Sequence, residues 1–391
     1  MGFGLFLSKT LARVPYVVPK AARNKYDGEM AKRRVELARD PKLPAKEYAK
    51  ARTSLIEQFG TGDASHAAVQ RCPKAPVAVV AAKAQRRRAR KELIARAGQA
   101  AADRHDPAGV AAAARLARDM DAIEKGRLAK HVYLKYDSDE DGKMPDDLKA
   151  LKESAPVGFK PATTEDLATL GLTPEDLAPG SMNFRAAVYK YDPAVWGPEY
   201  EGKFVVAVRG TTRNLQDWEN NFQNGGGKDS EYYRQAKSIG DKIRTAKMSD
   251  KVEVTGHSLA GGLAQAIHAG SGGEIAATTW NSAGTRDELA DQYNIAGKID
   301  ENRIQAYRVR GEVVTYEQEK GRKASFAPDA KGRKFDLDPA DPGMRKSDLS
   351  DAEREELHGM DNTIAALENQ KSQDEGTLQR ILAAPGLTGL A

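Results

Sequence analysis

The sequence predicts an α/β fold, a mostly parallel sheet with flanking helices, preceded by a helical N-terminal region. Beyond residue 180, short runs rich in Val and Ile alternate with helical segments, which is typical of parallel strands joined by crossover helices. Before residue 130 the chain is instead rich in Ala, Arg and Lys. Its 391 residues are sufficient for one α/β domain and a smaller helical part.

The charge distribution divides the chain into parts of opposite sign. Residues 1–130 contain 28 Lys and Arg against 13 Asp and Glu, whereas the remaining residues contain 33 against 43. We therefore expect three regions. They are a basic helical region at 1–130 with an accessory or delivery role, an acidic connecting segment at 131–180 that packs on the next region, and a catalytic α/β domain at 181–391.

The basic region is predicted to form helices at about 28–40, 44–59, 75–104 and 107–130. Its densest cluster, residues 86–91, contains four arginines and a lysine that suit anionic lipid or nucleic acid. A solvated helix face is the simpler interpretation. Aromatic residues are not interleaved with the charges, so we expect no nucleic-acid partner. Packing of these helices on the α/β domain is a further alternative.

The remaining elements follow in order along the chain. A short apolar element is expected at 131–134, and Thr163 and Thr173 are predicted helix N-caps because an acidic first turn follows each. The predicted strands span 184–189, 203–208, 251–255, 275–280 and 304–309, and the predicted helices between them span 231–247 and 259–269.

The strongest motif reads G-H-S-L-A and occupies residues 256–260. It fits the pattern G-x-S-x-G with Ala in place of the second Gly, and it lies between a predicted strand and a helix that begins with small residues. This setting lifts the Ser258 hydroxyl above the sheet, beside the N-terminus of a helix. The motif predicts a nucleophile elbow and thus an α/β-hydrolase. A serine that caps an ordinary turn is the alternative.

A serine nucleophile needs a general base, and in α/β-hydrolases an acid and then a histidine follow it along the chain. His257 adjoins the serine, so its ring is expected to point away. His268 lies ten residues further on along the following helix and is expected to be a packing or surface histidine. His358 is therefore the predicted base. Glu312, which follows the strand at 304–309, is the predicted acid. Four other carboxylates compete for that role: Asp287, Asp336, Asp338 and Asp361.

Two backbone N–H groups are expected to form an oxyanion hole, those of Leu259 and of Thr211. Thr211 follows the strand at 203–208, where it can also offer its hydroxyl. Trp218 and Phe222 lie four residues apart on a segment expected to be helical. They are candidates for a lid that exposes apolar surface to lipid, with ordinary core packing as the alternative.

These residues resemble the class 3 lipase family of α/β-hydrolases over roughly residues 180–365. The matching motifs are Arg209-Gly210-Thr211, Asp217-Trp218, Gly256-His257-Ser258-Leu259, Glu312-Val313-Val314 and His358. Two positions depart from the family pattern, since Ala260 replaces a glycine and Glu312 replaces an aspartate. The resemblance implies a serine carboxylic-ester hydrolase that acts on lipid.

Segments 217–223, 311–318 and 358–361 are more closely similar to bacterial lipase effectors, which are phospholipase toxins of contact-dependent secretion systems. This resemblance implies an antibacterial or host-directed phospholipase A-type enzyme, with an immunity protein and a secretion-system component as partners. We expect synthesis in the bacterial cytoplasm without a Sec signal, specialised export and action at a target-cell membrane. The alternatives are a triacylglycerol or small-ester esterase and an inactive hydrolase-fold binding protein.

The predicted chemistry requires no cofactor. A single cysteine, Cys72, excludes a disulfide within the chain and a CxxC metal site. Asp137, Asp139 and Asp141 resemble the start of a calcium-binding loop, but Leu148 stands where that loop needs its final glutamate. Calcium therefore remains a candidate beside a plain acidic turn. The sequence contains no apolar run long enough to span a bilayer.

Overall fold

The computed structural model describes residues 77–136, 155–210, 226–285, 291, 294–320 and 329–384. Within these residues, seven strands form one sheet whose spatial order follows the sequence. They are β1 (Phe159–Pro161), β2 (Ala186–Tyr191), β3 (Phe204–Val208), β4 (Val252–His257), β5 (Ala276–Trp280), β6 (Ile304–Val309) and β7 (Arg333–Leu337). The first three pair antiparallel, and β3 to β7 pair parallel. The predicted fold class, a mostly parallel sheet with flanking helices, is confirmed.

The described helices are α5 (Val77–Asp103), α6 (Pro107–Lys135), α8 (Thr164–Thr169), α9 (Pro174–Leu177), α10 (Pro193–Trp196), α12 (Gly226–Thr245), α13 (Leu259–Gly270), α15 (Val313–Lys320), α16 (Asp351–His358) and α17 (Met360–Ala383). Short 3-10 turns lie at Pro198–Tyr200, Ser249–Lys251, Ala296–Lys298, Glu301–Arg303 and Pro342–Met344. The two predicted threonine caps are confirmed, because Thr163 and Thr173 each form a capping box. Within this part of the chain, no helix has the length and apolar character to cross a membrane.

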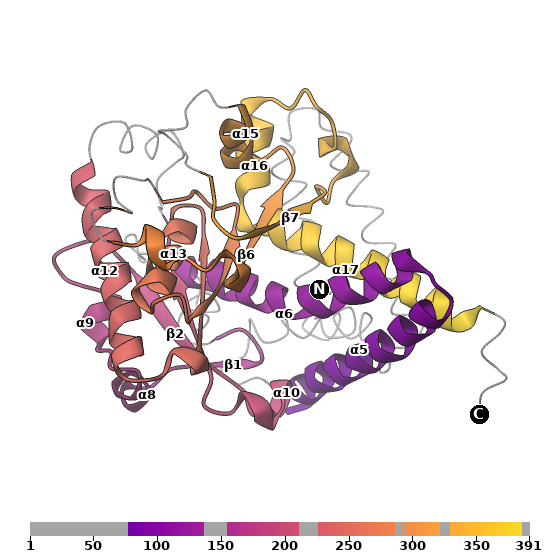
Figure 1. Cartoon of the computed structure of the whole chain (residues 1–391), viewed down its shortest axis with the longest axis horizontal. Coiled ribbons are helices and arrows are strands. Elements are labelled where there is room, and N and C mark those ends of the chain that lie inside the picture. The colour runs from indigo at the N-terminus through magenta and orange to yellow at the C-terminus, as the bar shows by residue number, and fades with distance from the viewer. Residues whose placement is uncertain are drawn as a thin grey trace, which may run out of the picture.

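Helices α12 and α13 cover one face of the sheet (Figure 1). Each connects two neighbouring parallel strands. Right-handed crossovers between strands in sequential order place their helices on the same side, so the chain connectivity itself positions both helices. The core between them and the sheet is mainly aliphatic, with Val206 and Val254 of the strands buried against Leu263 and Ile267 of α13.

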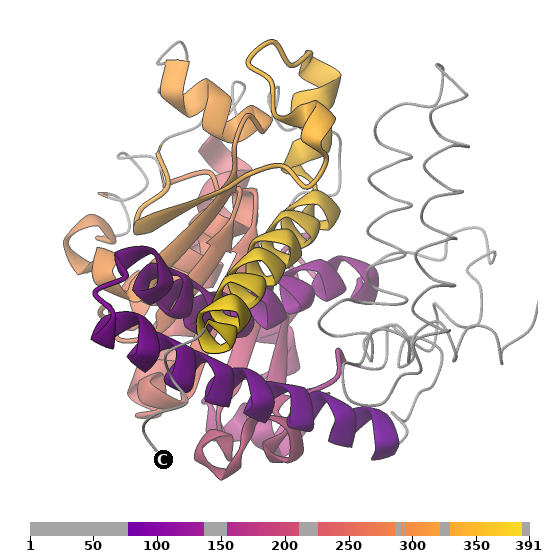
Figure 2. The same ribbon diagram turned by 90° about the vertical axis from the view of Figure 1, so that its right-hand side faces the viewer.

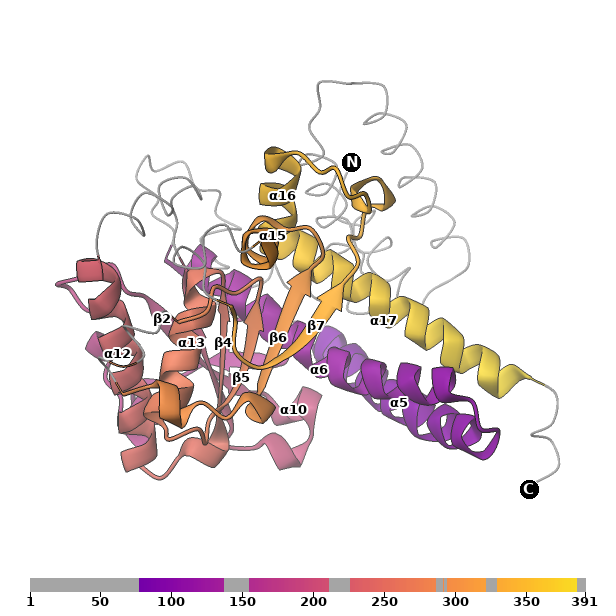
Figure 3. The same cartoon turned by 45° about the horizontal axis from the view of Figure 1, so that its top comes forward.

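Helices α6 and α17 cover the opposite face, and α5 lies against both of them (Figures 2 and 3). Ile123 of α6 is buried in one cluster with the sheet residues Trp280 and Tyr307. Leu128 is buried in another with Tyr189. Since these aromatic side chains would otherwise be exposed to water, α6 is an integral layer of the α/β domain.

Helix α6 passes through the domain boundary predicted at residue 130 and ends at Lys135. The segment 131–134, expected to be a separate apolar element, is its last turn, because its apolar residues continue the helical face that covers the sheet. For residues 77–135, packing on the α/β domain is thus the correct alternative. Residues 1–76 lie outside the described part, and an accessory or delivery role remains a prediction.

Three arginines of the basic cluster are buried: Arg86, Arg87 and Arg90. The Arg87 guanidinium donates a hydrogen bond to Asp121 at 2.7 Å, and it lies 3.7 Å from the centre of the Trp196 ring. Cation–π stacking and the long apolar stem of arginine favour such a buried position. A solvated face is therefore the wrong interpretation for these three residues, which contribute to the packing of α5.

Candidate active site

Ser258 lies in the turn between β4 and α13, with a backbone φ of 60° and ψ of −127°. Residues other than glycine rarely adopt a positive φ, and such strain is frequent at functional sites. A Cβ atom added at Gly256 would lie 2.1 Å from the Ala260 carbonyl oxygen, and one added at Gly261 would lie 2.0 Å from the Ser282 hydroxyl. The turn therefore requires small residues on both sides of the serine, as the motif predicted.

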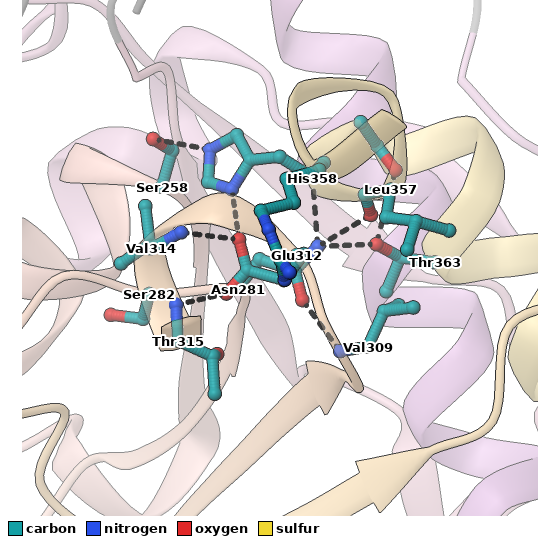
Figure 4. A network of polar contacts seen from close by, with 12 residues as sticks. Ser258, Asn281, Ser282, Val309, Glu312, Val314, Thr315, Leu357, His358 and Thr363 are labelled. Carbon is teal, nitrogen blue, oxygen red and sulfur yellow. Dashed lines mark hydrogen bonds and ion pairs between the residues drawn. The ribbon is translucent and has the colours of Figure 1, made fainter. Parts of the chain in front are cut away.

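The structure brings Ser258, His358 and Glu312 together (Figure 4). The Nε2 atom of His358 lies 2.9 Å from the Ser258 hydroxyl oxygen, and its Nδ1 atom lies 2.7 Å from Oε2 of Glu312. A carboxylate only accepts hydrogen bonds, so Nδ1 carries the proton and Nε2 is free to accept from the serine. All three residues are buried, in a geometry suited to activating the serine oxygen.

Glu312 is held in place by the N-terminus of α15. Its carboxylate accepts the backbone N–H of Val314 at 2.9 Å and that of Thr315 at 2.5 Å, in addition to the imidazole of His358. Burial opposes the charge of this group, but the hydrogen bonds from His358 and Thr315 hold the pKa of Glu312 below its usual value. The carboxylate is therefore ionised at neutral pH and oriented from two sides.

The competing carboxylates have other partners. Asp336 pairs with Arg308, Asp338 pairs with Arg310, and Asp361 pairs with Lys130. Asp287 lies outside the described residues. Among the described carboxylates predicted for this role, Glu312 is the one that the structure places against the histidine.

Sequence reasoning missed the neighbours that hold His358. The His257 ring does not point away from the site, since its centre lies 4.8 Å from that of His358 and its Nε2 atom lies 2.7 Å from the His358 carbonyl oxygen. Asn281, which follows β5, donates to the same carbonyl oxygen at 2.9 Å. Tyr133 of α6 contacts His257 from the other side. No local pattern signals these contacts, because the partners lie about a hundred residues apart.

Several predicted site residues lie outside the described part of the chain: Thr211, Trp218, Phe222, Asp137, Asp139 and Asp141. Leu259 is the first residue of α13, so its backbone N–H is one of those that a helix N-terminus leaves without a partner in the helix. Among the described residues, no group of three or more metal-ligating side chains is close enough to hold a metal ion.

Comparison with known proteins relates the chain to phospholipases. Residues 124–334 match a family of phospholipase-like proteins described as the Tle-like phospholipase domain. Over 234 residues the chain is 27% identical to an extracellular phospholipase A1 of Serratia liquefaciens, a match that covers 58% of this chain and 68% of that protein. The family match begins within α6 and contains Ser258 and Glu312. Both matches support a hydrolase of lipid esters, and they confirm the resemblance to bacterial phospholipases.

Proposed function

The chain belongs to the Tle-like phospholipase domain family, and on that premise we propose that it cleaves membrane phospholipids through an acyl-enzyme at Ser258. The observation that carries this proposal is the hydrogen-bonded series from the Ser258 hydroxyl through His358 to Glu312. It provides a nucleophile, a general base and an acid in the order along the chain that α/β-hydrolases use.

In the acylation step, the Ser258 oxygen attacks the acyl carbonyl carbon while Nε2 of His358 accepts the hydroxyl proton. The bond from that carbon to the glycerol oxygen then breaks, and His358 returns the proton to the departing lysophospholipid. Glu312 holds the imidazole in the required tautomer and stabilises its positive charge. The Leu259 N–H donates to the developing oxyanion, and Thr211 is the proposed second donor.

In the deacylation step, a water molecule gives a proton to His358 and attacks the acyl carbon on Ser258. A fatty acid leaves, the serine oxygen recovers its proton from His358, and the enzyme is restored. The reaction needs no cofactor. A phospholipase A-type specificity is favoured by the similarity to a phospholipase A1.

The similarity to bacterial effectors leads us to propose further that the protein is an exported toxin with a cognate immunity protein and a secretion-system partner. The relative is itself an extracellular phospholipase, which supports action outside the producing cytoplasm. Targeting of the chain to the periplasm of a bacterium without the immunity protein should stop growth, and Ser258→Ala should abolish this effect. Equal toxicity of both forms would contradict the effector proposal.

Incubation with liposomes of defined phospholipids, followed by mass spectrometry of the products, tests the enzymatic proposal. We expect free fatty acid and lysophospholipid in equal amounts, and the position of the remaining acyl chain identifies the ester that is cleaved. Triacylglycerol droplets and a short-chain nitrophenyl ester serve as competing substrates. Preference for either would favour a general esterase, and absence of hydrolysis of all three would favour a binding protein.

A further inference from the structure

His257 is a buried histidine whose two ring nitrogens both have partners. Its Nε2 atom lies 2.7 Å from the main-chain carbonyl oxygen of His358, and its Nδ1 atom lies 3.2 Å from the hydroxyl of Tyr133. The His257 imidazole therefore links the nucleophile elbow to the predicted base, His358, and to Tyr133 of helix α6. The proposed reaction assigns no task to this residue.

The partners of His257 determine its tautomer. A carbonyl oxygen only accepts, so Nε2 must carry the proton, and Nδ1 accepts from the Tyr133 hydroxyl. The backbone N–H of Gly210 in turn interacts with the Tyr133 oxygen. Burial and the nearby charge of His358 lower the pKa of His257 to about 3, so the ring is neutral at physiological pH.

Asn281 provides a second donor to the same carbonyl group. Its Nδ2 atom donates to the His358 carbonyl oxygen at 2.9 Å and to the Thr363 hydroxyl at 3.0 Å, while its Oδ1 atom accepts the Val309 N–H at 2.9 Å. Asn281 is fully buried and has a positive φ of 41°. It therefore connects the end of β6, just before Glu312, to the turn that carries His358 (Figure 4).

We infer that His257 is a positioning residue, which together with Asn281 holds the His358 peptide so that its imidazole reaches Ser258 and Glu312 at once. The inference rests on the proposed function. His358 is the last residue of α16, and Gly359 separates this helix from α17. The backbone of His358 is therefore not fixed by a continuous helix. Two donors on one carbonyl oxygen supply that constraint. A displacement of about 1 Å at such a base lowers turnover by about 10²-fold.

The neutrality of His257 is required by the same geometry. The ring centres of His257 and His358 are 4.8 Å apart, and His358 becomes positively charged during each half of the reaction. A second charged imidazole at that distance would oppose the charge on His358. An uncharged N–H donor positions the base without this penalty.

The test compares His257→Phe, which removes the donor but keeps a ring, with His257→Gln, whose amide can restore an N–H near the position of Nε2. We expect His257→Phe to lower kcat about 10²-fold on a soluble nitrophenyl ester with KM changed less than twofold. We expect His257→Gln to recover at least a tenth of the wild-type kcat. If His257 only stabilised the fold, His257→Gln would not restore kcat, and the folded fraction of His257→Phe would not lose kcat selectively.

His268 provides a control, because it is also buried but lies near the other end of α13, away from Ser258. It bridges backbone groups away from the base, with Nδ1 2.6 Å from the Ile275 carbonyl oxygen and Nε2 accepting the Asp300 N–H at 2.9 Å. His268→Gln should lower the melting temperature while leaving kcat of the folded enzyme unchanged.

Retention of kcat within threefold in folded His257→Phe, or equal losses in His257→Phe and His257→Gln, would overturn the inference. If His257→Phe does not fold, Tyr133→Phe tests the inference instead. It removes the hydroxyl that donates to Nδ1 of His257 and so fixes the tautomer of the ring, with little change in side-chain volume. It should lower kcat three- to tenfold at constant KM, and an unchanged kcat would count against the inference. Hydrolysis by wild-type enzyme and its loss in Ser258→Ala are measured first, so a failure of the proposed function is recognised separately.

Discussion

The helices on one face of the sheet, α12 and α13, connect consecutive strands. Those on the other face differ, since α6 precedes the first strand of the sheet and α17 follows the last one. The contacts differ accordingly. The core beneath α12 and α13 is mainly aliphatic, and ion pairs such as Lys242 with Asp176 lie at its partly exposed rim. Between α6, α17 and the sheet, charged side chains are buried within the interface itself.

Asp119 of α6 illustrates the second type of interface. Its buried carboxylate accepts hydrogen bonds from Arg118 at 2.6 Å, from the Tyr307 hydroxyl at 2.8 Å and from the Gln370 amide at 2.6 Å. It thereby joins α6 to β6 and to α17. The ion pair between Arg127 of α6 and Glu368 of α17, at 2.7 Å, is a second polar contact that joins these helices.

The difference shows two ways of fixing a helix on a sheet. A crossover between two neighbouring parallel strands already limits where α12 and α13 can lie, so non-directional apolar burial is sufficient there. Helices α6 and α17 have no such tether between strands, and directional polar contacts define their register. The candidate active site depends on both arrangements, since Ser258 directly precedes α13 and His358 is the last residue of α16, just before α17.

The largest expected effect on stability is on the polar face. Asp119→Ala should lower the free energy of unfolding by about 3–5 kcal/mol, because it leaves Arg118, Tyr307 and Gln370 without their shared acceptor in a buried place. Urea denaturation measures this change. Asp338→Ala is the control, since its pair with Arg310 is mostly exposed, and a loss below about 1 kcal/mol is expected. Equal losses in the two variants would contradict the distinction.

A decrease in pH is expected to have an intermediate effect on the free energy of unfolding. The pKa of His257 is about 3 in the folded protein and 6.5 ordinarily, so below pH 6.5 the unfolded chain binds a proton that the folded chain does not. The free energy of unfolding therefore decreases as the pH falls, and His257 contributes about 2–3 kcal/mol of that decrease between pH 7.5 and 4.5. The titratable groups facing it are His358 and Tyr133.

Urea unfolding of wild type and His257→Gln across this pH range isolates the contribution. The free energy of unfolding of the variant should depend less steeply on pH, and the difference in slope should correspond to the uptake of close to one proton on unfolding. Parallel curves for the two proteins would show that His257 does not remain neutral on folding.

The smallest effect is expected on the aliphatic face. Ile267→Val removes one buried methylene from α13 and should cost about 1 kcal/mol. Because Ile267 and Asp119 lie on opposite faces of the sheet, their effects should add within about 0.5 kcal/mol in the double variant. A larger coupling energy would show that the two faces do not respond independently.

Much of the fold was predictable because local patterns decide it. The strands β2, β3, β4 and β6 contain buried Val or Ile residues, and the buried Ile275 directly precedes β5. All five strands fall within a few residues of their predicted positions. β7 was missed because it lies at the sheet edge, where Arg333 and Lys334 are exposed and no apolar run marks it. The opposite charges of the two halves suggested separate modules, but the structure pairs them across one interface, as Arg127 and Glu368 show.

The candidate site was predictable where chain order and motif carry the information. Ser258 follows from the elbow, and His358 follows because the histidine comes last along the chain. The positions of His257 and Asn281 against the His358 carbonyl group were not predictable, since main-chain carbonyls leave no signature in the sequence. Such contacts emerge only when β4, β5 and the C-terminal helices are assembled.

Covalent labelling with a fluorophosphonate lipid analogue, followed by peptide mass spectrometry, tests the central claim most directly. The reagent phosphonylates an activated serine irreversibly, so it reports the nucleophile whatever the substrate is. We predict a single modification on Ser258 in the wild type, none in Ser258→Ala, and labelling slowed at least 10²-fold in His358→Gln. Ser271→Ala, which alters a buried serine at the other end of α13, should be labelled like the wild type. Modification of another residue, or undiminished labelling of Ser258→Ala, would contradict the account.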